Sequence, residues 1–271
     1  MSAFLNLART LEKFVPLSMV AAAGSGMMRL RGDRRRFEVD CDGHWVNRQP
    51  EASFVSPDVH AAYYDQVATR IKSHWLYDYV PQGGDVVVDV GAGIGEDAVI
   101  LSKLVGPSGK VHAIEAHPDV FRCLVSTVAR STLDNVECHH LAITERDGEV
   151  RISDDDQHLA NTIVDAESGI KVKALSLDHF FEQAQLDRID LLKMNIEGAE
   201  RDAMNGLRDH ADRIQRLAIS CHDFVADTGY GDKFRTKVEV RKRMVDLGFS
   251  IVKRSDAKTS WETDVLYGKR C

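Results

Sequence analysis

The chain has 271 residues, of which 44% are hydrophobic and 28% are charged, and its formal net charge is -7. This composition is typical of a globular protein large enough for one α/β domain and an extension. The acidic balance and the lack of a long basic run argue against a nucleic-acid groove as the main surface. Five scattered cysteines without a CxxC pair are typical of reduced thiols, so a cytoplasmic location is expected.

Residues 1–80 are predicted to form an N-terminal extension with helices and a hairpin, before a main domain at 81–271. Charged residues and Pro16 interrupt the first apolar stretch, which excludes a membrane span there. The extension is expected to cap a site or to form a homodimer through amphipathic helices. Its expected elements are a helix over 2–14, a helix over 17–29, a hairpin over 37–46 around Asp42-Gly43, and one or two helices over 57–79.

From residue 85 onward, apolar strands and helices alternate, which predicts a parallel sheet with right-handed crossovers. The last two strands are joined by a short turn, so that pair is expected to be antiparallel. Residues 149–175 interrupt the pattern with two short strands around a polar segment, which is interpreted as a lid. The expected strands are 85–90, 110–115, 135–142, 188–194, 215–221, 248–253 and 262–268, and the expected helices are 95–105, 118–131, 198–209 and 233–247.

A glycine-rich turn follows the first buried strand of the main domain, where Gly91, Gly93 and Gly95 are spaced as GxGxG. Glycines let the backbone turn sharply and let a ligand approach, and the next helix points its N-terminal amides at that ligand. Glu115 ends the following strand, where a carboxylate can accept hydrogen bonds from both hydroxyls of a ribose. Together these features predict a nucleotide-cofactor site.

The acids around the turn discriminate between cofactors. A dinucleotide fingerprint has its third glycine where this chain has Glu96, and a carboxylate is a poor neighbour for a pyrophosphate. S-adenosylmethionine has no phosphate and carries a cationic sulfonium, so Asp89 and Glu96 are both acceptable beside it. S-adenosylmethionine is therefore the predicted cofactor, and a nucleotide-dependent oxidoreductase is an alternative from another class.

Polar residues follow two later strands, and the ligands of open α/β sheets lie beyond such carboxyl ends. Asn195 and Glu197 follow the strand at 188–194, whereas His222 and Asp223 follow the strand at 215–221. An alcohol must lose its proton as it attacks a methyl group, either to a base or with the help of a metal ion.

His222 is the predicted base, and Glu197 is predicted to orient the acceptor or to bind a metal ion. The candidate ligands of Mg²⁺ are Glu197, His222 and Asp223. Two of them, His222 and Asp223, lie 27 and 28 residues after Asn195, a spacing similar to that of metal ligands in catechol-type O-methyltransferases. In the alternative interpretation, Glu197 caps the next helix and His222 makes ordinary hydrogen bonds.

Over residues 83–268 the chain resembles the FkbM family of S-adenosylmethionine-dependent methyltransferases. The family usually has an acid where this chain has Asn195, and often an asparagine where it has Gly93. The resemblance implies a class I methyltransferase fold: a Rossmann-like α/β sheet of seven strands, mostly parallel with one antiparallel strand, with helices on both faces. The segments that carry it are DVGAGIG at 89–95, AIEAHP at 113–118, LAIT at 141–144, SLD at 176–178 and DLLKMNIEGAE at 190–200.

The resemblance also implies roles for single residues and a reaction. Gly91, Ala92 and Gly93 would line the methionine part of the cofactor, Glu115 would hold the ribose, and two residues would flank the adenine. The implied activity is methylation of a hydroxyl of a sugar, oligosaccharide or glycosylated metabolite; a non-sugar, polyketide-type hydroxyl and a catalytically inactive binding protein are the alternatives. The predicted cofactor residues are Asp89, Gly91, Ala92, Gly93, Gly95, Glu115, Ala116, Leu141, Ala142 and Asn195.

Overall fold

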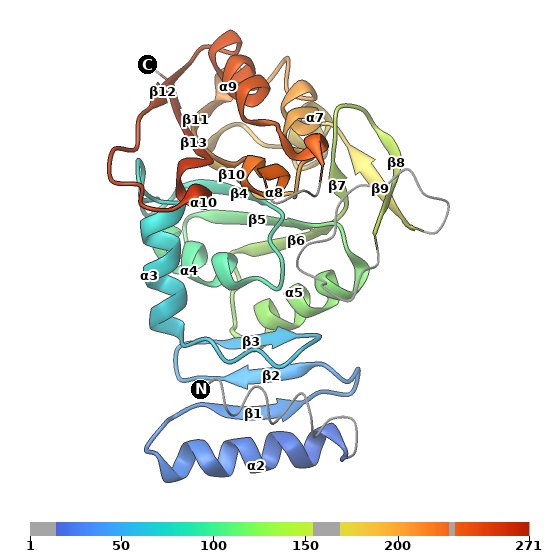
Figure 1. The fold of residues 1–271 in the computed structure, drawn as a ribbon, viewed down its shortest axis with the longest axis vertical. Coiled ribbons are helices and arrows are strands. Elements are labelled where there is room, and N and C mark those ends of the chain that lie inside the picture. The colour runs from blue at the N-terminus through green and yellow to red at the C-terminus, as the bar shows by residue number, and fades with distance from the viewer. Residues whose placement is uncertain (1–14, 154–168, 228–230, 271) are drawn as a thin grey trace.

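The structure is a computed structural model that describes residues 15–153, 169–227 and 231–270 (Figure 1). Its centre is a seven-stranded sheet with the order β12-β13-β11-β10-β4-β5-β6. In this sheet β13 runs antiparallel to both of its neighbours, whereas the other pairs are parallel. The class I methyltransferase fold expected from the sequence is confirmed. The strands are β4 (Val86–Val90), β5 (Lys110–Glu115), β6 (Val136–His140), β10 (Ile189–Met194), β11 (Ile214–Ser220), β12 (Phe249–Val252) and β13 (Val265–Arg270).

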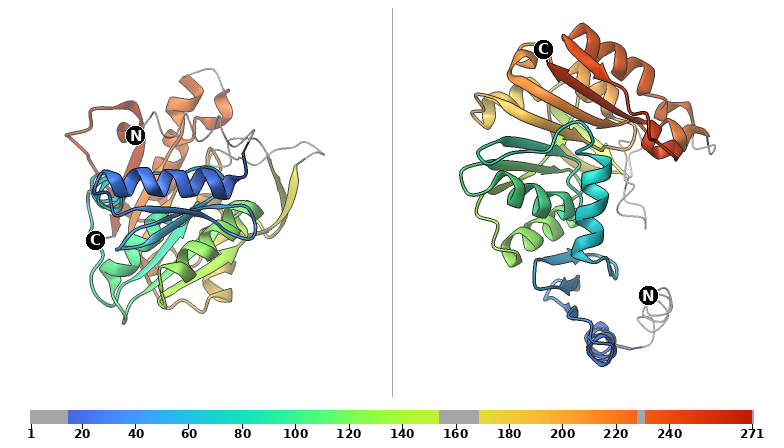
Figure 2. Two further views of the ribbon diagram at one scale, coloured as in Figure 1. Left: turned by 90° about the horizontal axis from the view of Figure 1, so that it is seen from below. Right: turned by 90° about the vertical axis from the view of Figure 1, so that its left-hand side faces the viewer.

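Helices cover both faces of this sheet (Figures 1 and 2). The apolar run of β4 serves both faces, because Val87 packs into one core and Val88 and Val90 pack into the other. A strand that is buried on both faces needs no alternation of polar and apolar residues. One face carries α3 (Tyr64–His74), α4 (Glu96–Val105) and α5 (Pro118–Arg130), and the other carries α6 (Leu177–Gln183), α7 (Glu200–Asn205) and α9 (Lys237–Asp246).

The N-terminal part forms a layer of its own beyond the main sheet (Figure 2). Helix α2 (Leu17–Leu30) packs on a small antiparallel sheet of β1 (Arg36–Val39), β2 (Trp45–Arg48) and β3 (Ser53–Ser56). The helix expected over 17–29 and the hairpin around Asp42-Gly43 are confirmed, whereas β3 was not predicted. The helix expected over 2–14 lies outside the described residues. The layer is anchored to the main domain where the Val55 amide donates to Thr127 Oγ1 of α5 at 2.9 Å.

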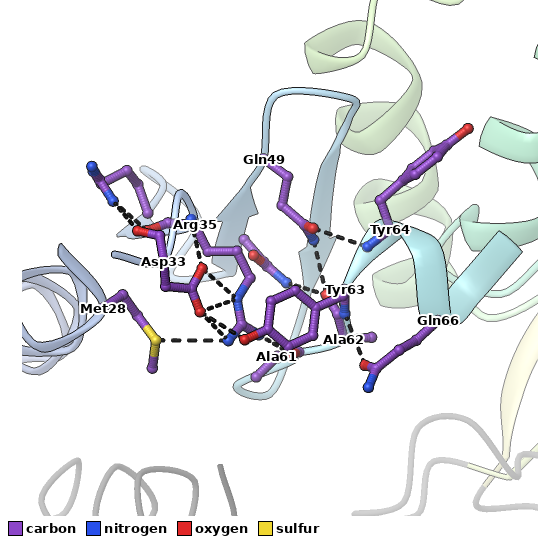
Figure 3. A network of polar contacts seen from close by, with 11 residues as sticks. Met28, Asp33, Arg35, Gln49, Ala61, Ala62, Tyr63, Tyr64 and Gln66 are labelled. Carbon is purple, nitrogen blue, oxygen red and sulfur yellow. Dashed lines mark hydrogen bonds and ion pairs between the residues drawn. The ribbon is translucent and has the colours of Figure 1, made fainter. Parts of the chain in front are cut away.

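A buried ion pair connects this layer to the start of α3 (Figure 3). Arg35 is 2% exposed, and its Nη2 lies 2.7 Å from Asp33 Oδ2. The guanidinium lies 3.5 Å from the centre of the Tyr63 ring, whose hydroxyl donates to Asp33 at 2.8 Å. Hydrogen bonds from Arg35 lower the pKa of Asp33 to about 2, so the pair is ionised at neutral pH. The network fixes α3 relative to the loop after α2.

Several element ends differ from expectation because a few local contacts decide them. The strand expected over 135–142 splits into β6 and β7 (Ala142–Ile143), and β7 joins another sheet. The strand expected from 262 begins at 265, because Glu262 accepts hydrogen bonds from the amides of Lys258 and Thr259 and starts the short helix α10 (Ser260–Thr263). Helix α6 was not predicted; Ser176 caps it by accepting from the His179 amide at 3.2 Å.

Two further helices are shorter than expected. The helix expected over 198–209 is reduced to α7, and the helix expected over 233–247 is divided into a 3-10 turn, η4 (Asp232–Phe234), and α9. The two strands expected in 149–175 are confirmed as the antiparallel pair β8 (Gly148–Ile152) and β9 (Ile170–Leu175). The polar segment interpreted as a lid lies mostly outside the described residues. Across the described ranges, no helix has the length and apolar character that a membrane crossing requires.

Candidate functional site

A cavity of about 430 Å³ lies at the carboxyl ends of β4, β5, β10 and β11. The structure brings most of the predicted site residues together there, although they come from distant parts of the chain. Asp89, Gly95 and Asp223 are the predicted residues that lie outside the lining. Those that line the cavity are Gly91, Ala92, Gly93, Glu115, Ala116, Leu141, Ala142, Asn195, Glu197 and His222.

The glycine turn after β4 lies directly against the turn after β10. Gly91 has a φ of +75, and a Cβ atom on it would collide with the backbone oxygen of Asn195. Gly93 has open space where a side chain would stand, which leaves room for a ligand. Gly95 caps α4 instead, and a Cβ atom there would lie 2.8 Å from Leu124 Cδ1 of α5. The cofactor contact predicted for Gly95 is therefore replaced by a packing contact between helices.

The carboxylate of Glu115 is held in place by backbone amides at the end of β5. Its Oε2 accepts from the Gly93 amide at 2.9 Å, and its Oε1 accepts from the His117 amide at 2.8 Å. Burial raises the pKa of Glu115 despite these hydrogen bonds. Each carboxylate oxygen keeps a further lone pair, so the group is oriented and still able to accept from a ribose.

Behind the turn, a buried lysine neutralises the acid predicted to contact the cofactor. Lys193 Nζ lies 2.7 Å from Asp89 Oδ1 and 3.2 Å from Asp97 Oδ2, and it donates to the Gly91 carbonyl at 3.1 Å. It also lies 4.8 Å from the centre of the Trp75 ring. Burial raises the pKa of Asp89 to about 6. Burial would lower the pKa of Lys193, but the carboxylates of Asp89 and Asp97 outweigh this effect and raise that pKa. Asp89 therefore stabilises the glycine turn indirectly, because it holds the Lys193 ammonium that donates to the Gly91 carbonyl.

Two glutamates flank His222 on the acceptor side of the cavity. Its Nδ1 lies 2.6 Å from Glu200 Oε1, and its Nε2 lies 3.3 Å from Glu197 Oε1. Glu200 is fully buried and also accepts from Thr236 Oγ1 at 3.0 Å. Burial alone would lower the pKa of His222, but the hydrogen bonds to Glu197 and Glu200 outweigh it and raise that pKa to about 10. The ring is therefore an imidazolium at neutral pH.

The backbone at Glu197 is strained. Its φ is +48, and the left-handed region is unfavourable for a residue with a side chain. Its carboxylate lines the cavity with 22% of the side chain exposed, whereas the side chain of His222 is 4% exposed. Strain of this kind is often retained where a side chain must point into a site. Glu197 is thus the member of the pair that a ligand can reach.

The predicted set of Mg²⁺ ligands is not assembled. Glu197 and His222 lie together, but Asp223 Oδ1 accepts from the amides of Thr236 and Lys237 at 2.9 Å and 3.0 Å and so caps the start of α9. The two ring nitrogens of His222 already face carboxylates, which leaves no lone pair toward an ion. These residues do not fit a magnesium site.

Part of the cavity wall comes from the N-terminal part of the chain. Arg70, His74 and Trp75, from α3 and its C-terminal end, line the cavity. Glu96 at the start of α4 lies 2.8 Å from Arg70 and 2.9 Å from His60. Burial opposes the ionisation of Glu96, but these two partners outweigh it and lower its pKa to about 2. An ionised carboxylate, paired with Arg70, therefore occupies the position of the third glycine of a dinucleotide fingerprint.

Three residues of the site were missed in the sequence: Arg70, Lys193 and Glu200. A signal existed for Lys193, because a charged residue interrupts an apolar strand that should be buried on both faces. Glu200 ends the segment that carries the family resemblance, but its contact with His222 depends on packing between α7 and β11. Nothing local marks Arg70, because the extension reaches the cavity only through its position in the fold.

Comparisons with known proteins identify a matching family and several similar methyltransferases. Residues 89–251 match the sequence model of the family described as the methyltransferase FkbM domain. Methyltransferase 1 of Beauveria bassiana is 25% identical over 177 residues, which cover 56% of this chain and 70% of that protein. A protein-L-isoaspartate O-methyltransferase of Methanococcus maripaludis is 43% identical over 54 residues, which cover 20% of this chain and 26% of that protein.

A crystal structure of methyltransferase FkbM from Methylobacillus flagellatus KT is similar to the fold, with a TM-score of 0.44 and 20% sequence identity. The match covers 69% of this chain and 43% of that one, so the chain spans less than half of that protein. The fold and the matched region define a methyltransferase. The chain belongs to the family of methyltransferases with an FkbM domain, because the family match covers more than half of it.

Proposed function

We propose that the chain is an S-adenosylmethionine-dependent O-methyltransferase that methylates a hydroxyl of a sugar, oligosaccharide or glycosylated metabolite. The proposal rests on one observation: two groups of residues suited to different ligands line the same cavity. Glu115 and the glycine turn lie on one side of it, and Glu197 with its partner His222 lies on the other. Two ligands that enter from these two sides would meet in the middle.

The donor side fits S-adenosylmethionine, which supplies a methyl group on a cationic sulfonium when bound. Gly93 leaves open space and Glu115 presents an oriented carboxylate for ribose hydroxyls. The lining of Leu141 and Ala142, with Ile152 from β8, provides an apolar surface for an adenine ring. The ionised Glu96 disfavours a pyrophosphate, which argues against the oxidoreductase alternative.

On the acceptor side, Glu197 is the better base. An imidazolium has no lone pair with which to take a proton, and the pKa of His222 is raised to about 10. In the proposal, the acceptor hydroxyl would donate its proton to a carboxylate oxygen of Glu197 as its oxygen bonds to the methyl carbon. The bond between that carbon and the sulfonium would break, and the donor would leave as the neutral thioether S-adenosylhomocysteine. His222 is then a positioning residue that holds Glu197 and carries a compensating charge.

The chemistry of the acceptor walls supports a polyhydroxylated substrate. Trp75 and Phe224 contribute aromatic side chains to the lining, and Arg70 and Glu197 contribute a donor and an acceptor of hydrogen bonds. A polyketide-type hydroxyl remains the alternative acceptor. Residues 1–80 would act as a cap in this proposal, since α3 supplies part of the wall. The homodimer expected from the N-terminal helices remains a prediction that sizing by light scattering would test.

Calorimetric titration and a transfer assay test the proposal together. The chain should bind S-adenosylhomocysteine and not NAD, and a labelled donor should transfer its methyl group to free or glycosylated sugars. Mass spectrometry would locate the methyl group on oxygen. Binding of NAD in place of S-adenosylhomocysteine would refute the donor assignment. Methylation restricted to non-sugar hydroxyls, or found on nitrogen or carbon, would refute the acceptor class.

A further inference from the structure

Two histidines and a glutamate meet at the edge of the main sheet, outside the lining of the cavity. His112 of β5 lies opposite Glu137 of β6, and His139 follows two residues later on the same strand. Residues two apart point to the same face of a strand, so all three side chains lie on one face. Phe180 of α6 covers them, with ring centroids 6.1 Å from His112 and 5.1 Å from His139.

The distances among their ligand atoms match those around a single small cation. His112 Nδ1 lies 3.1 Å from His139 Nε2, and His139 Nε2 lies 3.8 Å from Glu137 Oε1. One ligand atom from each residue lies within 4.8 Å of the other two. Two ligands bound to a tetrahedral zinc ion at about 2.05 Å are separated by about 3.3 Å. Small movements of the side chains would therefore bring all three atoms into coordination.

The surroundings favour a bound ion over a solvated cluster. His112 is 4% exposed, and the side chain of His139 is 11% exposed, so both rings are held in place by packing. Lys110 Nζ lies 3.2 Å from Glu137 Oε2, which leaves Oε1 toward the histidines. Outer contacts of this kind orient the ligands of metal sites. Imidazole nitrogen with carboxylate oxygen suits Zn²⁺ and similar transition ions better than Mg²⁺ or Ca²⁺.

We propose that His112, Glu137 and His139 bind one Zn²⁺ or a chemically similar divalent transition ion. The ion ties the edge strand β6 to β5, with water in the remaining position. Because the site is separate from the cavity, the proposal does not depend on the proposed methyl-transfer function. Its role is structural, since β6 is the edge strand of the main sheet and β5 is its one neighbour there.

Titration of the metal-free full chain with Zn²⁺ alone tests the site. Wild type should bind one equivalent that His139→Gln and Glu137→Gln lose, or bind at least about 100-fold more weakly, because each removes a ligand. His140→Gln is the matched control. His140 lies on the same strand, but it contacts the Ala116 carbonyl at 3.1 Å and the Phe121 ring, outside the cluster.

Thermal unfolding gives a second readout that does not depend on activity. At a Zn²⁺ concentration about 100-fold above the dissociation constant, the wild-type unfolding temperature should rise by roughly 5 °C or more. The rise should persist in His140→Gln and vanish in Glu137→Gln. The side chain of Glu137 is 50% exposed, so that variant is expected to fold. The proposal is wrong if wild type binds no Zn²⁺, or if His139→Gln and Glu137→Gln titrate like wild type.

Discussion

Replacement of Lys193 by methionine tests the charge arrangement beneath the glycine turn. The variant keeps a long apolar side chain against Trp75 but removes the ammonium 2.7 Å from Asp89. Asp89 is fully buried, so its charge would lose its nearest cation with no access to water. Loss of one partner from a buried ion pair costs about 3–5 kcal/mol, or roughly 10 °C in unfolding temperature.

The pH dependence of this loss follows from the pKa of Asp89. Burial already raises that pKa from 3.8 to about 6, and loss of Lys193 should raise it further. A carboxyl whose pKa is higher in the folded state binds a proton that the unfolded chain lacks, so stability falls as pH rises through the folded pKa. The variant should therefore lose less stability at pH 5 than at pH 8.

Urea unfolding of wild type and variant at the two pH values provides the measurement. The double variant Asp89→Asn with Lys193→Met removes both charges and should recover a large part of the stability lost at pH 8. The reasoning is refuted if Lys193→Met loses less than about 1 kcal/mol, well below the range for a broken buried pair. Equal losses at both pH values, or a double variant as unstable as the single one, would also refute it.

Two further predictions concern the cavity. The variant Gly91→Ala places a Cβ atom against the Asn195 carbonyl at a positive φ. Calorimetry should therefore show at least about tenfold weaker binding of S-adenosylhomocysteine, and an unchanged affinity would contradict the geometry. The pKa of His222 is raised from 6.5 to about 10, so its contribution to stability is complete below pH 6.5 and is lost as pH rises toward 10. Urea midpoints should fall over that range in wild type and change less in His222→Gln; identical profiles would contradict the assigned charge.

The sheet could be predicted because its strands are marked by local sequence patterns. The apolar run of β4 and the following glycine turn place one strand end and one helix start within a residue or two. Short elements could not be placed in the same way. Helices α6 and α10 begin where one residue, Ser176 or Glu262, accepts capping hydrogen bonds. One capping residue is too weak a sequence pattern to predict a short helix without the fold.

The candidate site likewise has one part that local sequence patterns predict and one part that depends on the fold. Gly91 and Glu115 lie close together in sequence, so their spacing alone predicted that they share a site, and both line the cavity. Its acceptor half depends on partners from separate elements. His222 was expected to be a base, but Glu197 and Glu200 together hold its charge. Asp223 was expected to bind a metal ion, but it caps α9. Residue type and spacing cannot specify a proton's location when the deciding neighbours come from another helix.

The most direct test of the account is the rate of methyl transfer in Glu197→Gln. Loss of the proton acceptor should lower kcat by about 10²–10⁴-fold, the usual contribution of a positioned base, while the affinity for S-adenosylhomocysteine stays as in wild type. Glu239→Gln is the matched control, because Glu239 is an exposed residue of α9 paired with Arg201. A Glu197→Gln enzyme with the wild-type kcat would contradict the account.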